Sequence, residues 1–187
     1  MLSKCGGKEK GLRVVEIANK FPRVEAVLAS IKEKYEYVGK TFSIVVPEKI
    51  EQIIEEGQAL KHCLDRSDRY FERIANQESY IVFLRRTKAM EQPYYTLEIE
   101  PDGTTRQKRT VGDNQNNDYH RAEKFLKKWQ AAIRPRLSQE DFERQEISRQ
   151  LRMYELESLR NDKVTVHGGI HAGELLADIL EADLMEA

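Results

Sequence analysis

Three consecutive β-strand signals between residues 80 and 111 constrain the fold of this chain more than any other feature. Residues 80–84 (Tyr-Ile-Val-Phe-Leu) form an almost continuous apolar run, which is typical of a strand covered on both faces. Residues 94–100 alternate apolar and polar side chains, and a Pro-Asp-Gly turn leads into a further strand at 105–111. Together with a β-branched segment at 41–46, these patterns predict a small antiparallel sheet of about four strands.

Helical spacing of apolar residues flanks these strands. The expected helices comprise residues 24–34, 48–64, 119–133 and 138–161. We expect 48–64 and 119–133 to cover the sheet, with Trp129 in the core. Gly57 marks a kink, a close approach or a break in the first of these two helices. Ser138, followed by Asp141, can cap a long charged helix that extends from the core or packs on its side. The fold class is therefore α+β.

The chain has 187 residues, which is enough for one core with appendages. In order, we expect a flexible N-terminus at 1–12, an α+β core at 13–136, an extended helix at 137–162 and a C-terminal tail with a short acidic helix at 163–187. Three glycines in the first twelve residues favour the flexible terminus. Whether the chain is a fragment of a longer protein is left open.

Charge and cysteine content exclude several classes of protein. The net charge is −1, so no global attraction to nucleic acid or to an anionic membrane is indicated. No apolar run approaches the ~20 residues that span a bilayer, and we expect a cytoplasmic protein with no membrane partner. Cys5 and Cys63 give neither a disulfide framework nor a metal site, and no cofactor can be named.

His62 and Cys63 are neighbours in the chain. On a helix their side chains would diverge by about 100°, so they are not expected to form a nucleophile–base pair. We interpret Cys63 as a small buried apolar residue. His62 is either a half-buried, hydrogen-bonding histidine or an acid–base group that acts on a substrate.

Charged and amide side chains gather on the predicted hairpin. If Glu100 lies opposite Thr105, then Glu98 lies opposite Gln107 on the polar face. With Arg85 at the end of the preceding strand, these residues could form a carboxylate–amide–guanidinium cluster for a polar ligand or a phosphate. Such charges are equally typical of a hairpin face that is exposed to solvent.

The only candidate nucleic-acid surface is a set of basic residues on the last strand and the helix that follows it. It comprises Arg106, Lys108, Arg109, Lys124, Lys127, Lys128, Arg134 and Arg136, of which Arg106, Lys108, Lys127 and Lys128 are the main candidates.

Several motifs occur in a fixed order across residues 42–129. They are Glu56-Gly57-x-x-Leu60-x-His62-Cys63, a strand that ends in Arg85, Thr96-Leu97-Glu98, and Gln107-x-Arg109. In this order they resemble the PcfJ-like family, whose members occur on bacterial conjugative plasmids, integrated elements and prophages. The resemblance implies a shared polar site at His62, Cys63, Arg85, Thr96, Glu98, Gln107 and Arg109. Two departures from the family pattern are Asp65, in place of a glycine, and a displaced Gly112 and Asn114.

Two functional classes follow. The first is an accessory protein of a mobile element that binds nucleic acid or a conjugation or replication protein, with possible homodimerisation through 138–161. The alternative is an enzyme that acts on an anionic substrate. In that case His62 and Glu98 are the candidate catalytic residues, and the candidate substrate-binding residues are Arg85, Gln107, Arg109 and Asn114.

Overall fold

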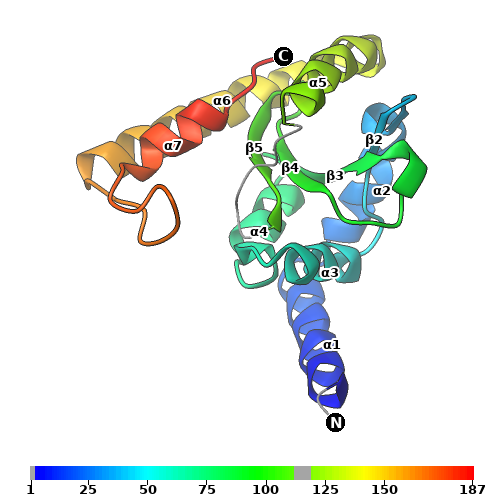
Figure 1. Ribbon diagram of the computed structural model, residues 1–187. Helices are drawn as coiled ribbons and strands as arrows, with labels where there is room; N and C mark the ends of the chain where they lie inside the picture. The colour runs from blue at the N-terminus through cyan, green and yellow to red at the C-terminus, as the bar shows by residue number, and fades with distance from the viewer. Residues whose placement is uncertain (1–2, 112–118) are drawn as a thin grey trace.

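The computed structural model describes residues 3–111 and 119–187 (Figure 1). It has the expected α+β class, with one antiparallel sheet whose strands lie side by side in chain order. The strands are β1 Tyr37–Val38, β2 Phe42–Val45, β3 Tyr80–Arg86, β4 Tyr95–Ile99 and β5 Thr105–Arg109. The expectation of about four strands therefore missed one short edge strand, β1, which is only two residues long and carries no alternation that could reveal it.

Seven α-helices surround the sheet within the described residues. They are α1 Ser3–Lys20, α2 Val24–Tyr35, α3 Ile50–Leu60, α4 Arg69–Ala75, α5 Tyr119–Ile133, α6 Gln139–Asn161 and α7 Leu176–Asp183. The predicted helices at 24–34, 119–133 and 138–161 are confirmed as α2, α5 and α6. The predicted cap is also present: the Asp141 N–H donates to Ser138 Oγ at 3.3 Å, and the Ser138 N–H donates to the Asp141 carboxylate at 2.7 Å.

Residues 3–12, part of the terminus that we expected to be flexible, belong instead to α1. Packing explains the difference, because Ile17 is fully buried and Lys10 forms an ion pair with Glu55 of α3 at 2.6 Å. Tertiary contacts of this kind outweigh the low helix propensity of glycine. In Figure 1, α1 projects below α3 and carries the N-terminus away from the sheet.

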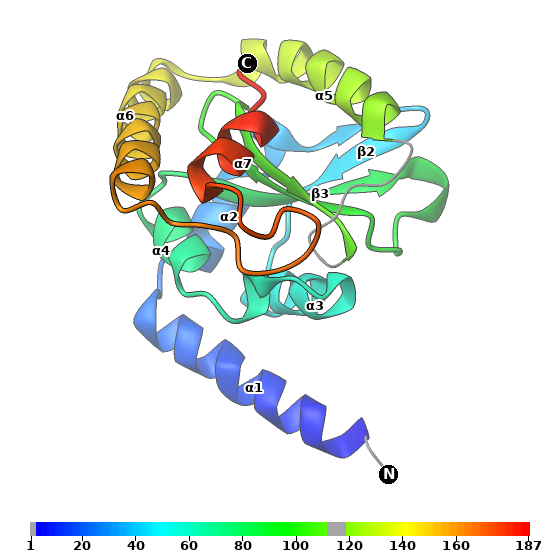
Figure 2. The same ribbon diagram turned by 60° about the vertical axis from the view of Figure 1, so that its left-hand side comes forward.

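The sheet lies between two helical layers. Figure 2 shows α5 above the sheet and α3 with α4 below it. Phe42 of β2 packs against Phe125 of α5 with ring centroids 5.7 Å apart. Trp129 of α5 is fully buried, as predicted, and its Nε1–H donates to the backbone oxygen of Tyr35 at 2.9 Å. Both faces of β4 are therefore buried, including the face expected to be exposed to solvent.

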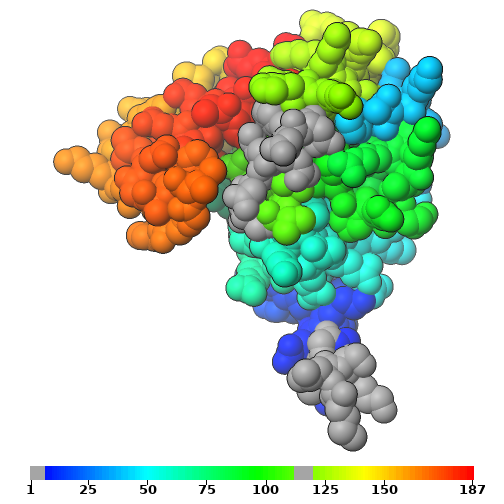
Figure 3. Space-filling model, viewed as in Figure 1, coloured from blue at the N-terminus to red at the C-terminus, as the bar shows by residue number. Residues whose placement is uncertain are grey.

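The long helix α6 packs along one side of the sheet, at the end where β3 begins and β4 ends. Its Ser148 Oγ donates to the backbone oxygen of Glu78, just before β3, at 2.6 Å. The segment α6–α7 forms the orange and red part of the space-filling surface in Figure 3.

No helix in the described ranges combines the length and apolar character needed to cross a membrane.

The helix predicted at 48–64 is broken after Leu60. Lys61 has a φ of 54°, and the His62 N–H donates back to the oxygen of Gly57 at 3.1 Å, which is a Schellman-type helix end. A Cβ on Gly57 would lie 2.8 Å from the backbone nitrogen of Asp65, so Gly57 marks a close approach. This break turns the chain so that His62 faces the sheet.

Candidate functional site

Five polar residues of neighbouring strands, which we call the polar strip, lie on the sheet face that α3 and α4 cover. They are Arg85 of β3, Thr96 and Glu98 of β4, and Gln107 and Arg109 of β5. Strand pairing places Glu98 opposite Gln107 and Thr96 opposite Arg109. The strip therefore unites the strand residues that the sequence singled out.

The expected pairing of Glu98 with Gln107 is confirmed, but the expected pairing of Glu100 with Thr105 is wrong. A β-bulge between Glu98 and Ile99 shifts the register, so that Ile99 faces Thr105. The bulge inserts an extra residue into one strand. Pairing residues one for one outward from the turn cannot anticipate this insertion.

Arg85 forms a bidentate ion pair with Glu56 of α3. Its two terminal nitrogens lie 2.7 and 2.5 Å from the two carboxylate oxygens of Glu56. Arg85 is only 6% exposed and Glu56 only 3% exposed. The guanidinium carbon also lies 4.7 Å from the centre of the Phe83 ring. A pair of this geometry fixes α3 on the sheet and neutralises both charges.

His62 is buried and lies within hydrogen-bond distance of Thr96. Its Nε2 is 3.0 Å from the Thr96 hydroxyl oxygen. Of the two interpretations of His62, the geometry matches the hydrogen-bonded histidine directly. An acid–base role would require a substrate to reach the same imidazole nitrogen.

Glu98 is the most densely bonded member of the polar strip. Its Oε1 accepts hydrogen bonds from Arg73 Nη1 of α4 at 2.8 Å and from the Ser79 hydroxyl at 2.6 Å. Its Oε2 accepts a bond from Gln107 Nε2 at 3.2 Å, and Arg106 Nη1 lies 3.8 Å from Oε1. The side chain is only 2% exposed. A carboxylate–amide–guanidinium cluster therefore exists, in a buried position.

Two opposing effects act on the pKa of Glu98. Burial by itself would raise that pKa, but the positive charges of Arg73 and Arg106 and the hydrogen bond from Ser79 outweigh burial and lower it. Glu98 is therefore a carboxylate at neutral pH. A group held in this form can accept hydrogen bonds, but it is poorly suited to donate a proton.

The cluster continues into α6 through alternating charges. Arg106 Nε and Arg152 Nε each donate to Glu100 Oε1 at 2.7 Å, and Arg73 Nη2 donates to Glu155 at 2.5 Å. Glu100 is fully buried. Because α6 supplies both Arg152 and Glu155, ion pairs rather than apolar contacts make up much of its attachment to the sheet.

Arg109 and its neighbour Lys108 share one partner, Asp183, at the end of α7. Arg109 Nη1 lies 2.5 Å from the Asp183 carboxylate, and the Lys108 backbone N–H donates to the same oxygen at 2.7 Å. Burial lowers the pKa of Lys108, and the nearby Asp183 charge offsets this only in part.

The structure separates the candidate nucleic-acid residues into two groups. Arg106 and Lys108 are only 5% and 2% exposed and are engaged in the ion pairs described above. Lys127 and Lys128 lie on the exposed face of α5. Arg106 and Lys108 thus belong to the interior, where Glu78 and Glu100 pair with Arg106 and Asp183 pairs with Lys108.

Two further expectations concern single residues. Cys63 was expected to be buried, but this prediction is wrong: Cys63 is exposed, because the chain leaves the helix before it, and its Sγ lies 3.9 Å from the hydroxyl of Tyr70. Asn114 lies outside the described residues. Within the described ranges, no group of three His, Cys, Asp or Glu side chains is placed to hold a metal ion.

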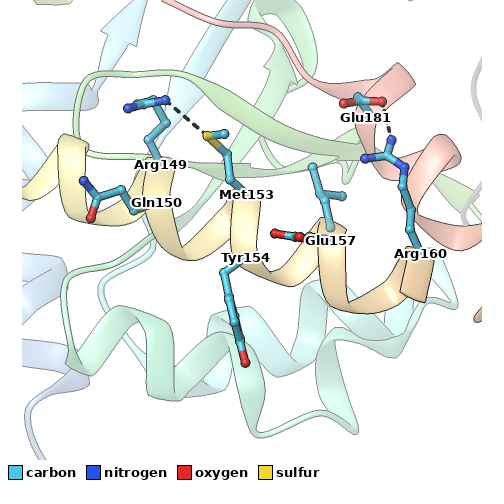
Figure 4. Close-up of a pocket in the computed structure, with 8 residues that line it drawn as sticks. Arg149, Gln150, Met153, Tyr154, Glu157, Arg160 and Glu181 are labelled. Carbon is cyan, nitrogen blue, oxygen red and sulfur yellow. Dashed lines mark hydrogen bonds and ion pairs between the residues drawn. The ribbon is translucent and has the colours of Figure 1, made fainter. Parts of the chain in front are cut away.

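The space beside the polar strip is small. A hollow of about 20 Å³, roughly the room that one water needs, lies where α6 and α7 meet the strip, against Arg73, Gln107 and Leu184. A shallow hollow of about 520 Å³ lies instead on the outer side of α6. Its lining includes Met153, whose sulfur lies 3.2 Å from an Arg149 nitrogen (Figure 4).

Sequence reasoning missed the partners that complete the strip. Glu56 belongs to the Glu56-Gly57-x-x-Leu60 motif, but no role was assigned to it from the sequence. Its position one turn before Leu60, on the apolar stripe of the helix, was the sequence signal that its side chain is buried. Arg73 was not singled out, because its helix, α4, is only seven residues long. Asp183 gave no signal, since 75 residues separate it from Lys108.

Comparison with known proteins gives one match. A family model described as PcfJ-like protein matches residues 13–124, which span the whole polar strip but neither α6 nor α7. No curated protein and no solved structure matches the chain.

Proposed function

The chain belongs to the PcfJ-like protein family, and from this premise we propose that it is an accessory protein of a bacterial mobile genetic element that binds nucleic acid through α5. The observation that carries the proposal is the basic outer face of this helix. Residues 119–136 contain six lysines and arginines but one acidic residue, Glu123. Charge concentrated on one face attracts the phosphate backbone even when the whole chain is close to neutral.

The spacing of these cations places three of them on one face of the helix. Arg121, Lys124 and Lys128 lie three to four residues apart, so they share one helix face, and all three are exposed. The opposite face of α5 carries the buried residues Leu126 and Trp129. In Figure 2 the outer side of α5 points away from the sheet. A nucleic-acid backbone can therefore approach this face without any rearrangement of the core.

We expect the triple variant Arg121→Glu/Lys124→Glu/Lys128→Glu to bind short labelled DNA or RNA at least about tenfold more weakly than the wild type. Each lost phosphate contact should also reduce the slope of log affinity against log salt by about one. Fluorescence anisotropy across a salt series measures both quantities.

The matched control reverses three exposed cations elsewhere, Lys40, Arg66 and Lys88. It carries the same change in net charge, so its affinity should fall much less if α5 is the binding surface. Equal losses in the two variants would mean that only net charge matters. Wild-type-like binding by the α5 variant would contradict the proposal.

An enzymatic alternative places His62 and Glu98 in catalysis and Arg85, Gln107 and Arg109 at an anionic substrate. The enzymatic alternative is supported by the meeting of these residues on one sheet face. This alternative is the weaker proposal, because Glu56 already neutralises Arg85, and a substrate would first have to separate such ion pairs. An increase in melting temperature with a small phosphorylated or carboxylated compound would be the first sign of it.

For the partner of α6, we propose a second copy of the chain. Ile147, Leu151 and Tyr154 recur at helical spacing and are 60%, 44% and 74% exposed. The stripe is nearly symmetric about Leu151, so an antiparallel copy would place Ile147 against Tyr154 and Leu151 against itself. Self-complementarity of this kind is what a twofold dimer requires.

We expect Tyr154→Glu to weaken the dimer by more than about tenfold, as is usual for a buried aromatic anchor at an interface. Sedimentation equilibrium over a concentration series measures this change. Met153→Glu is the control, because Met153 is also exposed but lies on another side of α6. A wild-type chain that stays monomeric at all concentrations would contradict the proposal.

A further inference from the structure

The outer edge of β5 is completed by residues from the far end of the chain. The Thr105 N–H donates to the Met185 oxygen at 2.9 Å, and the Met185 N–H donates to the Thr105 oxygen at 2.8 Å. In both ribbon views the red C-terminal segment lies against β5 (Figures 1 and 2). The two bonds form a single antiparallel bridge, which is the kind of main-chain contact that an extended peptide makes when it docks on a sheet edge.

Beside this pairing, a cationic cradle holds the carboxylate of Asp183. The cradle consists of the Lys108 backbone N–H at 2.7 Å and Arg109 Nη1 at 2.5 Å. Lys108 Nζ lies 3.6 Å from the other carboxylate oxygen and donates to the backbone oxygen of Asp183 at 2.6 Å. A backbone N–H, a guanidinium and an ammonium group that converge in this way are well suited to bind a carboxylate.

The main chain of the segment is recognised as well. Gln130 Nε2 donates to the Met185 oxygen at 3.0 Å, and Lys127 Nζ donates to the Glu186 oxygen at 2.6 Å. These contacts involve the backbone of the segment and are therefore independent of its side chains. They fix an extended conformation, as in other cases where a peptide extends a sheet.

Two side chains of the segment supply the specificity. Asp183 and Met185 are 3% and 5% exposed, whereas Leu184 between them is half-buried. Asp183 is the last residue of α7 and Met185 lies in the extended residues that follow it, so the end of the helix and the chain beyond it bring a carboxylate and a large apolar side chain into the same groove. Met185 also belongs to the main apolar core, so it anchors the segment.

The rest of α7 is held loosely. Only Ala177 and Asp183 of this helix are buried, and its ion pairs from Asp178 and Glu181 to Arg160 are exposed. Residues 167–174, which lead into α7, are exposed throughout. Release of the segment would therefore expose chiefly the Met185 side chain, since the rest of α7 has few buried contacts, and segments with few buried contacts open locally.

We propose that the β5 edge and the Lys108–Arg109 cradle form a docking groove for a short acidic segment of a partner protein, and that residues 183–186, at the end of α7 and just beyond it, occupy this groove in cis as a latch. The partner segment carries an Asp followed two residues later by a large apolar side chain. A tethered segment has an effective concentration of about millimolar order, so the groove of the free chain is closed to weak competitors.

The test uses a fluorescent peptide with the sequence of residues 181–187 and the full-length variant Met185→Asp. The substitution places a carboxylate at the buried anchor and releases the latch. We expect the peptide to bind this variant at least about tenfold more tightly than it binds the wild type, since the competing cis segment is lost. Fluorescence anisotropy measures the affinities.

Three controls test the chemistry of the groove. A peptide with Asn in place of the residue corresponding to Asp183 should lose most of its affinity, and so should the intact peptide tested on Met185→Asp/Arg109→Met. Adding Arg121→Met instead removes a cation on α5 and should leave peptide binding unchanged. If Met185→Asp is folded by circular dichroism and does not bind the peptide, the proposal is overturned.

Hydrogen exchange on the unaltered chain gives a second test that does not depend on the variant. A latch opens without global unfolding, so the Thr105 and Met185 amides should exchange at least about a hundredfold faster than the amide of Val82 in the central strand β3. If the three amides exchange at one common rate, the segment is an inseparable part of the sheet, and the proposal is overturned.

Discussion

The Glu98→Gln variant is expected to lose about 3 kcal/mol of unfolding free energy, which is the lower end of the range for breaking a buried ion pair. The loss arises because Arg73 and Arg106 no longer share a buried carboxylate, although Glu155 still pairs with Arg73 and Glu100 with Arg106. Glutamine is close to glutamate in size, so the loss reports charge and hydrogen bonding rather than a cavity. The glutamine side chain also keeps one oxygen that can accept the hydrogen bond from Ser79, which likewise places the expected loss of unfolding free energy at the lower end of that range. Urea unfolding followed by circular dichroism measures the change.

The control for this variant is Glu146→Gln, which removes an exposed carboxylate from α6 and should leave stability nearly unchanged. Acid provides a further check. The pKa of Glu98 is lowered by folding, so its contribution is complete above the unfolded pKa of about 4.3 and is lost as pH falls through the folded value. The difference between wild type and Glu98→Gln should therefore shrink in acid. A difference that does not depend on pH would contradict this account.

The second large effect is expected for Arg85→Met, which should also lower the unfolding free energy by about 3–5 kcal/mol. Methionine fills much of the space of the arginine stem but leaves Glu56 as a buried charge without its bidentate partner. The double variant Arg85→Met/Glu56→Gln removes that charge as well and should recover part of the loss. The two substitutions therefore should not be additive, and a double-mutant cycle measures the coupling.

Arg86 provides the matched control, since it is the next residue of β3 and is exposed. Its guanidinium carbon lies 4.3 Å from the centre of the Tyr94 ring, a contact worth about 0.5–1 kcal/mol. If Arg85→Met were as mild as Arg86→Met, the pairing of Arg85 with Glu56 would not be a main support of the fold. Arg85 would then be better explained as a ligand-binding residue.

The elements that could be predicted are those whose signals are local. The apolar run of β3, the alternation of β4 and the one-sided apolar face of α5 each lie within a single segment, and each is found where expected. The α6 cap is equally local, since Ser138 and Asp141 are three residues apart. The opposition of Glu98 and Gln107 was also predicted correctly, although the Glu100–Thr105 pairing from which it was counted is wrong, because the bulge lies between Glu98 and the turn.

What could not be predicted depends on distant contacts. The polar face of β4 looked suited to solvent, and its burial depends on distant partners such as His62 and Arg73, the latter from a helix too short to be recognised. Lys108 looked like a surface cation until Asp183 was found beside it. α1 likewise forms despite its glycines, because Ile17 packs into the core. Charge can be assigned to the interior only when its partner is known.

The sheet, with its strands in chain order, implies an order of events during synthesis. β1 to β5 need only residues 37–109 for their pairing. Short loops join β1 to β2 and join β3, β4 and β5 to one another, so these neighbours can pair quickly, whereas α3 and α4 lie between β2 and β3. Arg106 and Glu100, however, obtain their α6 partners only when residues 145–152 have left the ribosome. At about 5–20 residues per second, the nascent sheet waits several seconds with these charges solvated. The chain therefore reaches its final packing late, when the closing helix is delivered.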